Sequence, residues 1–412
     1  MGCAQLVWAR APALRRDMLL REGPRPPPVE YSRAPSHHAP SGVDRSMKTW
    51  NVGIVGLRRG RGFVNVFGAH PRVNVTALCD INEKSLGDLG EAFDLPDSAL
   101  FTDFDEFVNA DTDIVMVATP IRFHAPHTIA SLEAGKDVLC EQTAAYTVEE
   151  CEQIVEAVKR TGRGYMMAEN YCYFHYVREW RKLTEAGKLG TIFHAEAEYV
   201  HEIESLLIDP ETGGYFWRHE RPPIWYCAHC LGPLLTLMED RIVAASGSSA
   251  GFHKHPEQSE HLGFLDMEIG MFRTEKGALI KIARSQVAPR YPHMVYYSLY
   301  GTKGYVENGR SGSNTQGFQW IEGETPDGPN GQRQAEVIDC PVVDPDAPEE
   351  AKHGGHGTSE YYMIREFLDA LEAGVKPPID VMRSMDFTIP GIVAHESAMS
   401  DGNWRDVPLF GW

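Results

Sequence analysis

Apolar runs of strand length alternate with helical patterns from residue 48 onward. The run Trp50–Val55 suits a strand buried on both faces of a sheet, and Val73–Leu78 repeats this pattern. A helix is predicted over Phe63–Ala69. The first strand and this helix are joined by a turn with three glycines, Gly56, Gly60 and Gly62. Strand, glycine-rich turn, helix and strand in this order predict a dinucleotide-binding βαβ unit.

The alternation continues to residue 170. Further helices are predicted over Leu86–Phe93, His124–Ala134 and Val148–Lys159, and further strands over Asp113–Ala118, Asp137–Cys140 and Gly164–Ala168. Strands separated by helices form a parallel sheet, and ligands bind where its strands end. We therefore predict a Rossmann NAD-binding domain over residues 47–170.

Strands predominate beyond residue 170. A helix over Tyr176–Ala186 precedes seven predicted strands with turn signals between them, Ile192–His201, Ile242–Gly247, Phe264–Arg273, Ala278–Gln286, Met294–Tyr300, Gly304–Glu307 and Gly317–Ile321. An acidic, proline-rich surface excursion at 322–351 and helices over Ser359–Ala373 and Met382–Ser400 complete the chain. The predicted fold class is α/β, with a second α/β domain over residues 171–412 that contains a large, mostly antiparallel open sheet.

Composition narrows the classes of function. The 412 residues favour two domains, and the net charge of −19 argues against nucleic acid or an anionic membrane as a partner. No apolar run reaches the length of a transmembrane helix. The eight cysteines are scattered, and Cys227 and Cys230 lack the second half of a zinc site. We expect reduced thiols, a cytoplasmic protein and no bound metal.

Residues 1–46 differ from the rest of the chain. They are rich in proline and arginine, and Arg15-Arg16 is followed by no apolar segment of an export signal. We expect either a disordered tail or a translation start assigned too early, with Met47 as the true first residue.

The glycine turn suits a dinucleotide. Glycines let the backbone approach a pyrophosphate, and the following helix offers free N–H groups to it. Asp80 ends the second strand, where a carboxylate can bind a ribose diol and would repel the 2′-phosphate of NADP. The turn departs from G-x-G-x-x-G because arginines occupy positions 58 and 61. An ordinary glycine turn in an α/β core is the alternative.

Four motifs resemble the Gfo/Idh/MocA oxidoreductase family: GIVG at 53–56, CDIN at 79–82, VATP at 117–120 followed by His124, and LEAGKDVLCE at 132–141. The resemblance covers residues 48–412. It implies a Rossmann domain joined to an α/β domain whose open sheet often forms oligomer contacts, so we expect a homo-oligomer. We assign NAD binding to Gly56, Arg58, Arg59, Gly60, Asp80, Thr119, Pro120, His124, Glu141, Gln142 and Asn170.

Two positions depart from the dehydrogenases of this family. Most members read E-K-P where this chain has Glu141-Gln142-Thr143, and glutamine cannot do the acid–base work of lysine. The usual D-x-x-x-H pair keeps its histidine as His229 but has Trp225 in place of the aspartate. A conventional NAD-dependent sugar dehydrogenase therefore becomes the second interpretation, and a non-catalytic NAD-binding protein the third.

Five further segments resemble the NAD-dependent glycosidases of glycoside hydrolase family 109 and the sulfoquinovosidases of family 188: EQTAAYTVEEC, AENYCY, HAEAEYVHE, YCAHCLGPL and HGGHG. This resemblance implies a retained NAD, oxidation at the sugar C3, loss of the C2 proton, elimination of the aglycone, water addition and return of the hydride. Family 109 implies α-N-acetylgalactosaminides and family 188 implies sulfoquinovosides. The arginines at 218–221 favour an anionic sugar glycoside as the substrate.

The resemblance also implies two catalytic residues. Tyr173 falls on the base tyrosine, whose phenol would be ionised with the help of nearby positive charge. His229 would bind the C3 hydroxyl and take its proton. The alternatives are an aromatic residue packed at the domain junction and a structural histidine. Substrate binding is assigned to Arg122, Tyr226, His201, Glu202, Trp217 and Arg218.

Overall fold

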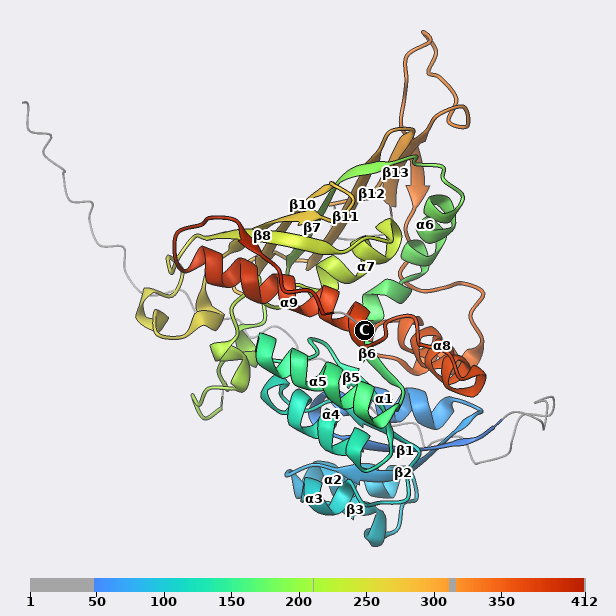
Figure 1. Cartoon of the computed structure of the whole chain (residues 1–412), viewed down its shortest axis with the longest axis vertical. Helices are drawn as coiled ribbons and strands as arrows, with labels where there is room; N and C mark the ends of the chain where they lie inside the picture. The colour runs from blue at the N-terminus through green and yellow to red at the C-terminus, as the bar shows by residue number, and fades with distance from the viewer. Residues whose placement is uncertain (1–47, 210, 311–315, 411–412) are drawn as a thin grey trace, which may run out of the picture. The chain divides into compact units, whose positions relative to one another are not determined.

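The computed structural model describes residues 48–209, 211–310 and 316–410, and all of them belong to one compact unit, Ala39–Trp412. The prediction for residues 1–46 lies outside the described residues. The described chain contains two sheets, drawn in Figure 1, and the helices pack on and between them. The predicted α/β class is confirmed.

The first sheet has the strand order β3-β2-β1-β4-β5-β6 and is parallel throughout. Its strands are β1 (Trp50–Val55), β2 (Val73–Cys79), β3 (Leu100–Phe101), β4 (Ile114–Val117), β5 (Asp137–Glu141) and β6 (Tyr165–Ala168). The accompanying helices are α1 (Leu57–Ala69), α2 (Glu83–Ala92), α3 (Phe104–Phe107), α4 (His124–Glu133) and α5 (Val148–Thr161). The strand order reverses between β1 and β4, which is where a doubly wound sheet binds its ligand.

Helix α1 begins six residues earlier than predicted. It starts at Leu57, so Gly60 and Gly62 lie inside the helix and only Gly56 forms the turn. Gly56 has φ +90°, and a Cβ there would lie 2.6 Å from the backbone of Ala118. A Cβ on Gly60 would lie 3.0 Å from Ile54. The glycines therefore bring α1 close to the sheet, which explains a pattern that had suggested a longer turn.

The second sheet has the order β14-β13-β12-β11-β7-β10-β9-β8-β15. Neighbours pair antiparallel except β7 and β10, which are parallel. Its strands are β7 (Ile192–Val200), β8 (Ile242–Ser249), β9 (Glu268–Thr274), β10 (Leu279–Ser285), β11 (Met294–Gly301), β12 (Gly304–Asn308), β13 (Gln316–Ile321), β14 (Glu336–Asp339) and β15 (Arg405–Asp406). This confirms the mostly antiparallel sheet.

Two predictions for the second half need correction. The strand expected to start at Phe264 starts at Glu268, because residues 262–264 form a 3₁₀ turn. The surface excursion contributes an edge strand, β14, which pairs with β13.

Helix α7 (Ala228–Met238) was not predicted, since Gly232 and Pro233 lie within it. Ten of its eleven residues are buried, so it shows no alternation of polar and apolar faces.

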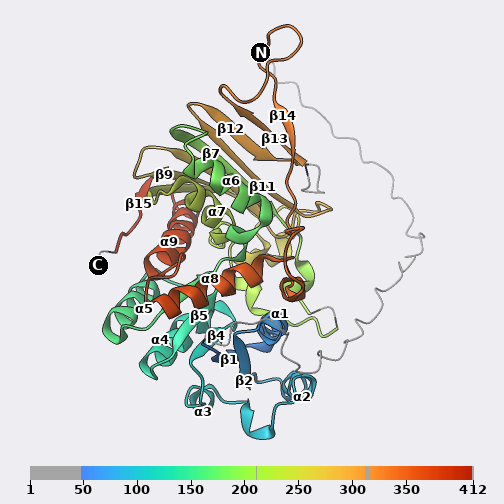
Figure 2. The ribbon, with the colours of Figure 1, turned by 90° about the vertical axis from the view of Figure 1, so that its right-hand side faces the viewer.

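Helices α6 (His175–Glu185), α7 and α9 (Val381–Ala398) lie along one side of the nine-stranded sheet (Figure 2). The C-terminal helices also return to the Rossmann domain. Helix α9 packs on α5 and β6, and α8 (Ser359–Ala373) packs on α1. Arg72, which is 4% exposed, reaches from the Rossmann domain to both Asp369 and Glu372 of α8. This contact joins the turn before β2, at the amino end of that strand, to α8.

Candidate functional site

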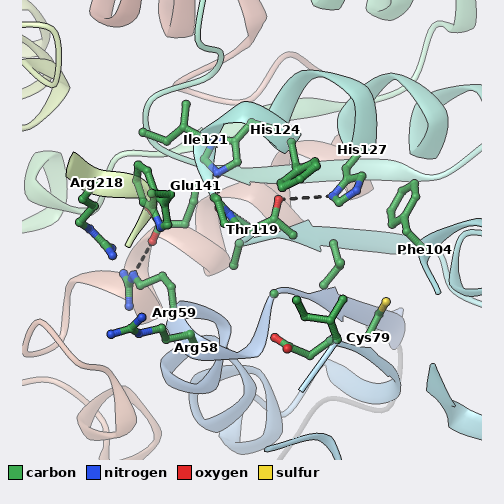
Figure 3. A pocket seen from close by; sticks show the side chains of 18 of the residues that line it. Arg58, Arg59, Cys79, Phe104, Thr119, Ile121, His124, His127, Glu141 and Arg218 are labelled. Carbon is green, nitrogen blue, oxygen red and sulfur yellow. Dashed lines mark hydrogen bonds and ion pairs between the residues drawn. The ribbon is translucent and has the colours of Figure 1, made fainter. Parts of the chain in front are cut away.

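A cavity lies where the strands of the first sheet end, and the second domain forms part of its wall (Figure 3). It brings together most of the residues predicted to bind NAD: Gly56, Arg58, Arg59, Asp80, Thr119, Pro120, His124, Glu141 and Gln142. Three residues predicted to bind substrate join them from the second domain: Trp217, Arg218 and Tyr226. Residues far apart in the sequence thus share one site.

The other predicted residues lie elsewhere. Gly60 is buried inside α1, and Asn170 is 1% exposed beyond the cavity wall. Arg122 is an exposed residue paired with Glu220. His201 and Glu202 follow β7: the His201 Nδ1 lies 2.6 Å from the Tyr199 hydroxyl. Glu202 accepts hydrogen bonds from Tyr291 and from the backbone of residue 204.

The arginine-rich end of the cavity suits a pyrophosphate. Gly56 and the first turn of α1 form its floor, and Arg58 and Arg59 project from that turn. Figure 3 shows these two side chains and Arg218 at the same end of the cavity. The Arg59 Nε lies 2.6 Å from Glu141 Oε1, and this contact helps raise the pKa of Arg59 above its ordinary value against the opposing effect of burial. The carboxylate therefore fixes the guanidinium in place.

Asp80 is held in a defined orientation at the end of β2. Its Oδ2 accepts a hydrogen bond of 2.5 Å from the backbone N–H of Leu57, and its Oδ1 accepts one of 2.8 Å from Asn82. A carboxylate fixed this way at the cavity wall suits the ribose diol of NAD.

The far end of the cavity is aromatic and was missed from the sequence. The rings of Phe104 and His127 stack with centroids 3.9 Å apart, and Phe123 stacks on the other side of the histidine. Burial lowers the pKa of His127 to about 4, so its ring is neutral. Neutral aromatic walls of this kind suit the adenine of the dinucleotide. The signal was weak because Phe104 lies about one strand away in the sequence from the segment that carries Phe123 and His127.

His124 forms part of the cavity wall and is held on both sides. Its Nδ1 lies 2.7 Å from the Thr143 carbonyl oxygen and its Nε2 lies 2.8 Å from the Thr119 carbonyl oxygen. Burial alone would lower its pKa, but Cys140 and the two carbonyls raise the pKa to about 9. Both ring nitrogens therefore donate, and the imidazolium joins the loops that follow β4 and β5.

His229 lies beside the cavity in the first turn of α7, between two polar partners. Its Nε2 is 2.9 Å from the amide nitrogen of Gln142, and its Nδ1 is 2.7 Å from Glu169 Oε1. Because an amide nitrogen only donates, Nε2 is the acceptor and Nδ1 carries the proton toward Glu169. Burial lowers the pKa of His229 well below 6.5 and raises that of Glu169 well above 4.5. The resting ring is neutral, with its basic nitrogen at Gln142.

Buried polar atoms without hydrogen-bond partners lie around His229 and Glu169. Among the described residues, Gln142 Oε1, Glu169 Oε2 and Asn170 Nδ2 are buried without a hydrogen-bond partner. Buried polar groups are normally satisfied, so orphaned atoms beside a cavity favour a bound polar ligand. The donor set, the anchored carboxylate and the aromatic end fit NAD along the cavity.

Tyr173 is not brought to the cavity. Its side chain is 5% exposed, lines a second pocket together with Arg181 and Arg383, and hydrogen-bonds Glu366. Burial and this carboxylate raise its pKa well above 10. The structure therefore places Tyr173 away from the cavity that brings the other predicted site residues together.

Other tyrosines contact the ring of His229, and Tyr199 meets it edge-on at 5.6 Å. Tyr171 stacks on the His229 ring at 3.8 Å, and its hydroxyl donates to Tyr199 over 3.3 Å. Tyr226 meets the ring edge-on at 5.5 Å and lines the cavity. The sequence placed Tyr171 only within a motif, because nothing local shows which side of the 3₁₀ turn at 170–173 faces α7.

The described residues give two further limits. They contain no group of three or more histidine, cysteine or acidic side chains arranged to hold a metal ion. Among them, no helix is both long and apolar enough to cross a membrane. The seven described cysteines are free and buried.

Comparison with known proteins gives one family match for each of the two domains that form the site. Residues 50–169 match the NAD-binding Rossmann fold of the GFO_IDH_MocA oxidoreductase family. Residues 217–411 match the C-terminal domain of glycosyl hydrolase 109. The chain combines these two family domains. The predicted resemblance to this glycosidase branch and the predicted NAD cofactor are thereby confirmed.

Relatives of the same architecture are similar over most of their length. A glycosyl hydrolase family 109 protein from Solibacter usitatus is 27% identical over 392 residues, covering 88% of each chain. An alpha-N-acetylgalactosaminidase from Shewanella oneidensis is also 27% identical, covering 88% of this chain and 85% of its own.

Solved structures share the fold of both domains. An oxidoreductase domain protein from Kribbella flavida superposes with a TM-score of 0.74 at 22% identity and covers 88% of this chain and all of its own. Levoglucosan dehydrogenase in complex with NADH and L-sorbose gives the same TM-score at 19% identity, with the same coverage.

The anchored carboxylate at the end of β2 generates a prediction about the cofactor. Asp80→Asn keeps the size of the side chain and removes its charge. We expect NAD affinity to fall by roughly tenfold or more, because a charged hydrogen bond to the ribose is lost, while NADP affinity falls less or rises. Titration of the apoprotein with both dinucleotides measures the ratio. Asp88→Asn, which removes an exposed carboxylate paired with Lys84, is the matched control. An unchanged ratio in Asp80→Asn would contradict the assignment.

Proposed function

We propose that the protein is an NAD-dependent glycosidase that hydrolyses a glycoside by transient oxidation at C3 and keeps its cofactor. One observation carries this proposal: the basic nitrogen of His229 faces Gln142, at the position where dehydrogenases of this fold place lysine. The match of residues 217–411, which include His229, to the C-terminal domain of glycosyl hydrolase 109 supports this proposal.

His229 has the geometry of a proton acceptor for a sugar hydroxyl. Glu169 holds its Nδ1–H over 2.7 Å, which orients the ring and stabilises the imidazolium formed when Nε2 gains a proton. In the resting site the Gln142 amide donates a hydrogen bond to Nε2. Because this amide is neutral, a substrate hydroxyl can displace it. The C3 hydroxyl would then deliver its proton to Nε2.

Bound NAD supplies a hydride acceptor at C3 and returns the same hydride later, which makes the net reaction a hydrolysis. The chain itself contributes the contacts that would retain the cofactor. Arg59 bridges Glu141 of the Rossmann domain, at 2.6 Å, and Glu360 of α8, at 3.5 Å. Glu360 in turn holds His356 of the HGGHG segment at 2.7 Å. This series of contacts joins the two domains at the arginine-rich end of the cavity.

The second candidate is an NAD-dependent sugar dehydrogenase that releases NADH. The structural likeness to levoglucosan dehydrogenase favours it at the level of the fold. Gln142 stands against it, since an amide does not relay protons as lysine does.

An anionic glycoside such as a sulfoquinovoside is the substrate class that the charges favour. Arg218 lines the cavity, and Arg221 and Arg284 lie close behind it, 1% and 2% exposed. Among the described residues, none of these three arginines forms an ion pair with a carboxylate. A sulfonate or carboxylate would balance this positive charge. The alternative substrate is the α-N-acetylgalactosaminide that the name of the Shewanella oneidensis relative indicates.

The glycosidase reaction makes a direct prediction. Protein purified without added NAD should release NAD on denaturation and should cleave a 4-nitrophenyl α-glycoside with no net NADH. Glu169→Gln should lower turnover by roughly 10²-fold or more, because the ring loses the carboxylate that orients it. Glu349→Gln, which changes an exposed carboxylate paired with Lys352, is the control. Net NADH without glycoside cleavage would return the protein to the dehydrogenases.

Arg218 provides a test of the substrate class. Arg218→Ala should lower kcat/KM for 4-nitrophenyl α-sulfoquinovoside by roughly tenfold or more, since a charge-assisted contact is lost. The same variant should affect 4-nitrophenyl α-N-acetylgalactosaminide less. Arg160→Ala, which removes an exposed arginine paired with Glu133, controls for the loss of a positive charge. Equal losses on both glycosides would contradict the anionic substrate.

A homo-oligomer formed through the open sheet is also part of the proposal. Ile269, Leu279, Phe318 and Val337 are 42%, 37%, 42% and 60% exposed. Register places all four on the face opposite the helices. Apolar side chains gathered on an uncovered sheet face favour association with another copy.

The oligomer is tested on this face. The double variant Phe318→Glu and Ile269→Glu should shift the protein to a smaller species in light scattering after size exclusion, because buried like charges would face one another. Val375→Glu, which changes an exposed apolar residue outside the sheet, is the control. A monomeric wild type would contradict the interface. A cytoplasmic location remains a prediction.

A further inference from the structure

We propose that Tyr226, held against the buried cation of Arg221, is the base that removes the C2 proton after C3 has been oxidised. This inference rests on the proposed function. It assigns the step for which the resemblance implied Tyr173.

The location of Tyr226 at the cavity wall distinguishes it from the other described tyrosines. It is the one tyrosine among the described residues that lines the cavity, beside Gln142, Trp217 and Arg218. Its ring lies edge-on to His229 with centroids 5.5 Å apart. Groups that act on neighbouring sugar carbons must lie next to each other, as these two do. Tyr171 and Tyr173 do not line the cavity, and the Tyr171 hydroxyl donates to Tyr199.

Arg221 provides a charge for a phenolate to balance. Its guanidinium carbon lies 3.7 Å from the centroid of the Tyr226 ring. The side chain is 1% exposed, donates to Gln286 Oε1 over 2.5 Å, and has no carboxylate within ion-pair distance among the described residues. Its Nε has no hydrogen-bond partner there. An unpaired buried cation is costly, and an adjacent anion offsets that cost.

The surroundings act on the pKa of the Tyr226 phenol in opposing directions. Burial raises the pKa of Tyr226 above 10, and Arg221 is the strongest influence that opposes this rise. Arg284 adds a second guanidinium 5.3 Å from the ring. Burial lowers the pKa of Arg221 to about 9, the mark of a cation without a counter-charge. The resting phenol is neutral, and its ionised form is the reactive one.

The step balances with these groups. The phenol first loses its proton to solvent. The C2–H bond of the 3-keto sugar then breaks, its proton moves to the phenolate oxygen, and its electron pair forms the C1–C2 double bond. The C1–O bond to the aglycone breaks, and the aglycone oxygen takes a proton from solvent. In the second half, water adds its oxygen at C1 and releases one proton to solvent, while the Tyr226 phenol returns a proton to C2 and is left as the phenolate.

Exchange at C2 tests the assignment separately from glycoside cleavage. Holoenzyme is incubated in D₂O with sulfoquinovose, and in parallel with N-acetylgalactosamine, while NMR follows loss of the C2 proton and absorbance follows nicotinamide reduction. Wild type should reduce its bound nicotinamide and exchange the proton on one of the two sugars. Tyr226→Phe should keep nicotinamide reduction and lose exchange by roughly 10²-fold or more. Retained reduction also shows that the variant is folded.

Arg221→Gln tests the positioning role through pH. The pKa of Tyr226 lies above 10, so the phenolate fraction and the exchange rate should rise roughly tenfold per unit between about pH 6.5 and pH 8.5. Removing Arg221 raises that pKa further, so exchange at a fixed pH should fall by roughly tenfold or more. A structural role alone would lower exchange and nicotinamide reduction together, and that result would overturn the role of Arg221.

The outcomes separate this inference from the function on which it rests. Exchange retained in Tyr226→Phe, or lost in Tyr173→Phe instead, would overturn the assignment and leave the glycosidase standing. Wild type that neither reduces its cofactor nor exchanges the proton on either sugar would overturn the proposed function and this step with it. Tyr215→Phe, an exposed tyrosine bonded to Gln258, is the matched control.

Discussion

The buried contact between Glu169 and His229 is the constraint on which the site depends. Glu169 follows the last strand of the Rossmann sheet, and His229 begins α7 under the second sheet. Neither group is easily buried alone, so their hydrogen bond fixes how the two domains meet. Gly232 makes the approach possible, because a Cβ there would lie 2.7 Å from the Glu169 side chain. The orientation of the His229 ring toward Gln142 depends on this one contact.

The charge of the whole chain and the charge of the site have opposite signs. The net charge is −19, yet Arg58, Arg59, Arg218, Arg221 and Arg284 gather in and behind the cavity. Glu141 and Glu360 balance Arg59, and the deeper arginines lie among aromatic rings and backbone carbonyls. Positive charge in a low-dielectric site acts strongly on an anion and weakly at a distance. The acidic surface therefore gives no guide to the ligand.

A histidine, an amide and a phenol around one cavity are the groups by which the proposed glycosidase would differ from a dehydrogenase of the same fold. The fold supplies a place for hydride transfer, and the side chains decide the fate of the oxidised sugar. Gln142 removes the proton relay of a lysine and leaves a neutral contact at His229 Nε2. The proposed elimination also needs a second proton acceptor. It must lie near C2, beside the C3 carbon that is oxidised first.

The sequence by itself determined the elements whose signals are local. Buried strands, amphipathic helices, Gly56 and Asp80 emerged from patterns of a few residues, and the motifs identified both family domains. Tertiary structure alone decided the rest. Helix α7 is buried on every side and so has no periodic signal, and only packing showed that Tyr226 rather than Tyr173 lines the cavity. Which side of a short turn faces a cavity depends on contacts with distant segments, and local sequence does not record them.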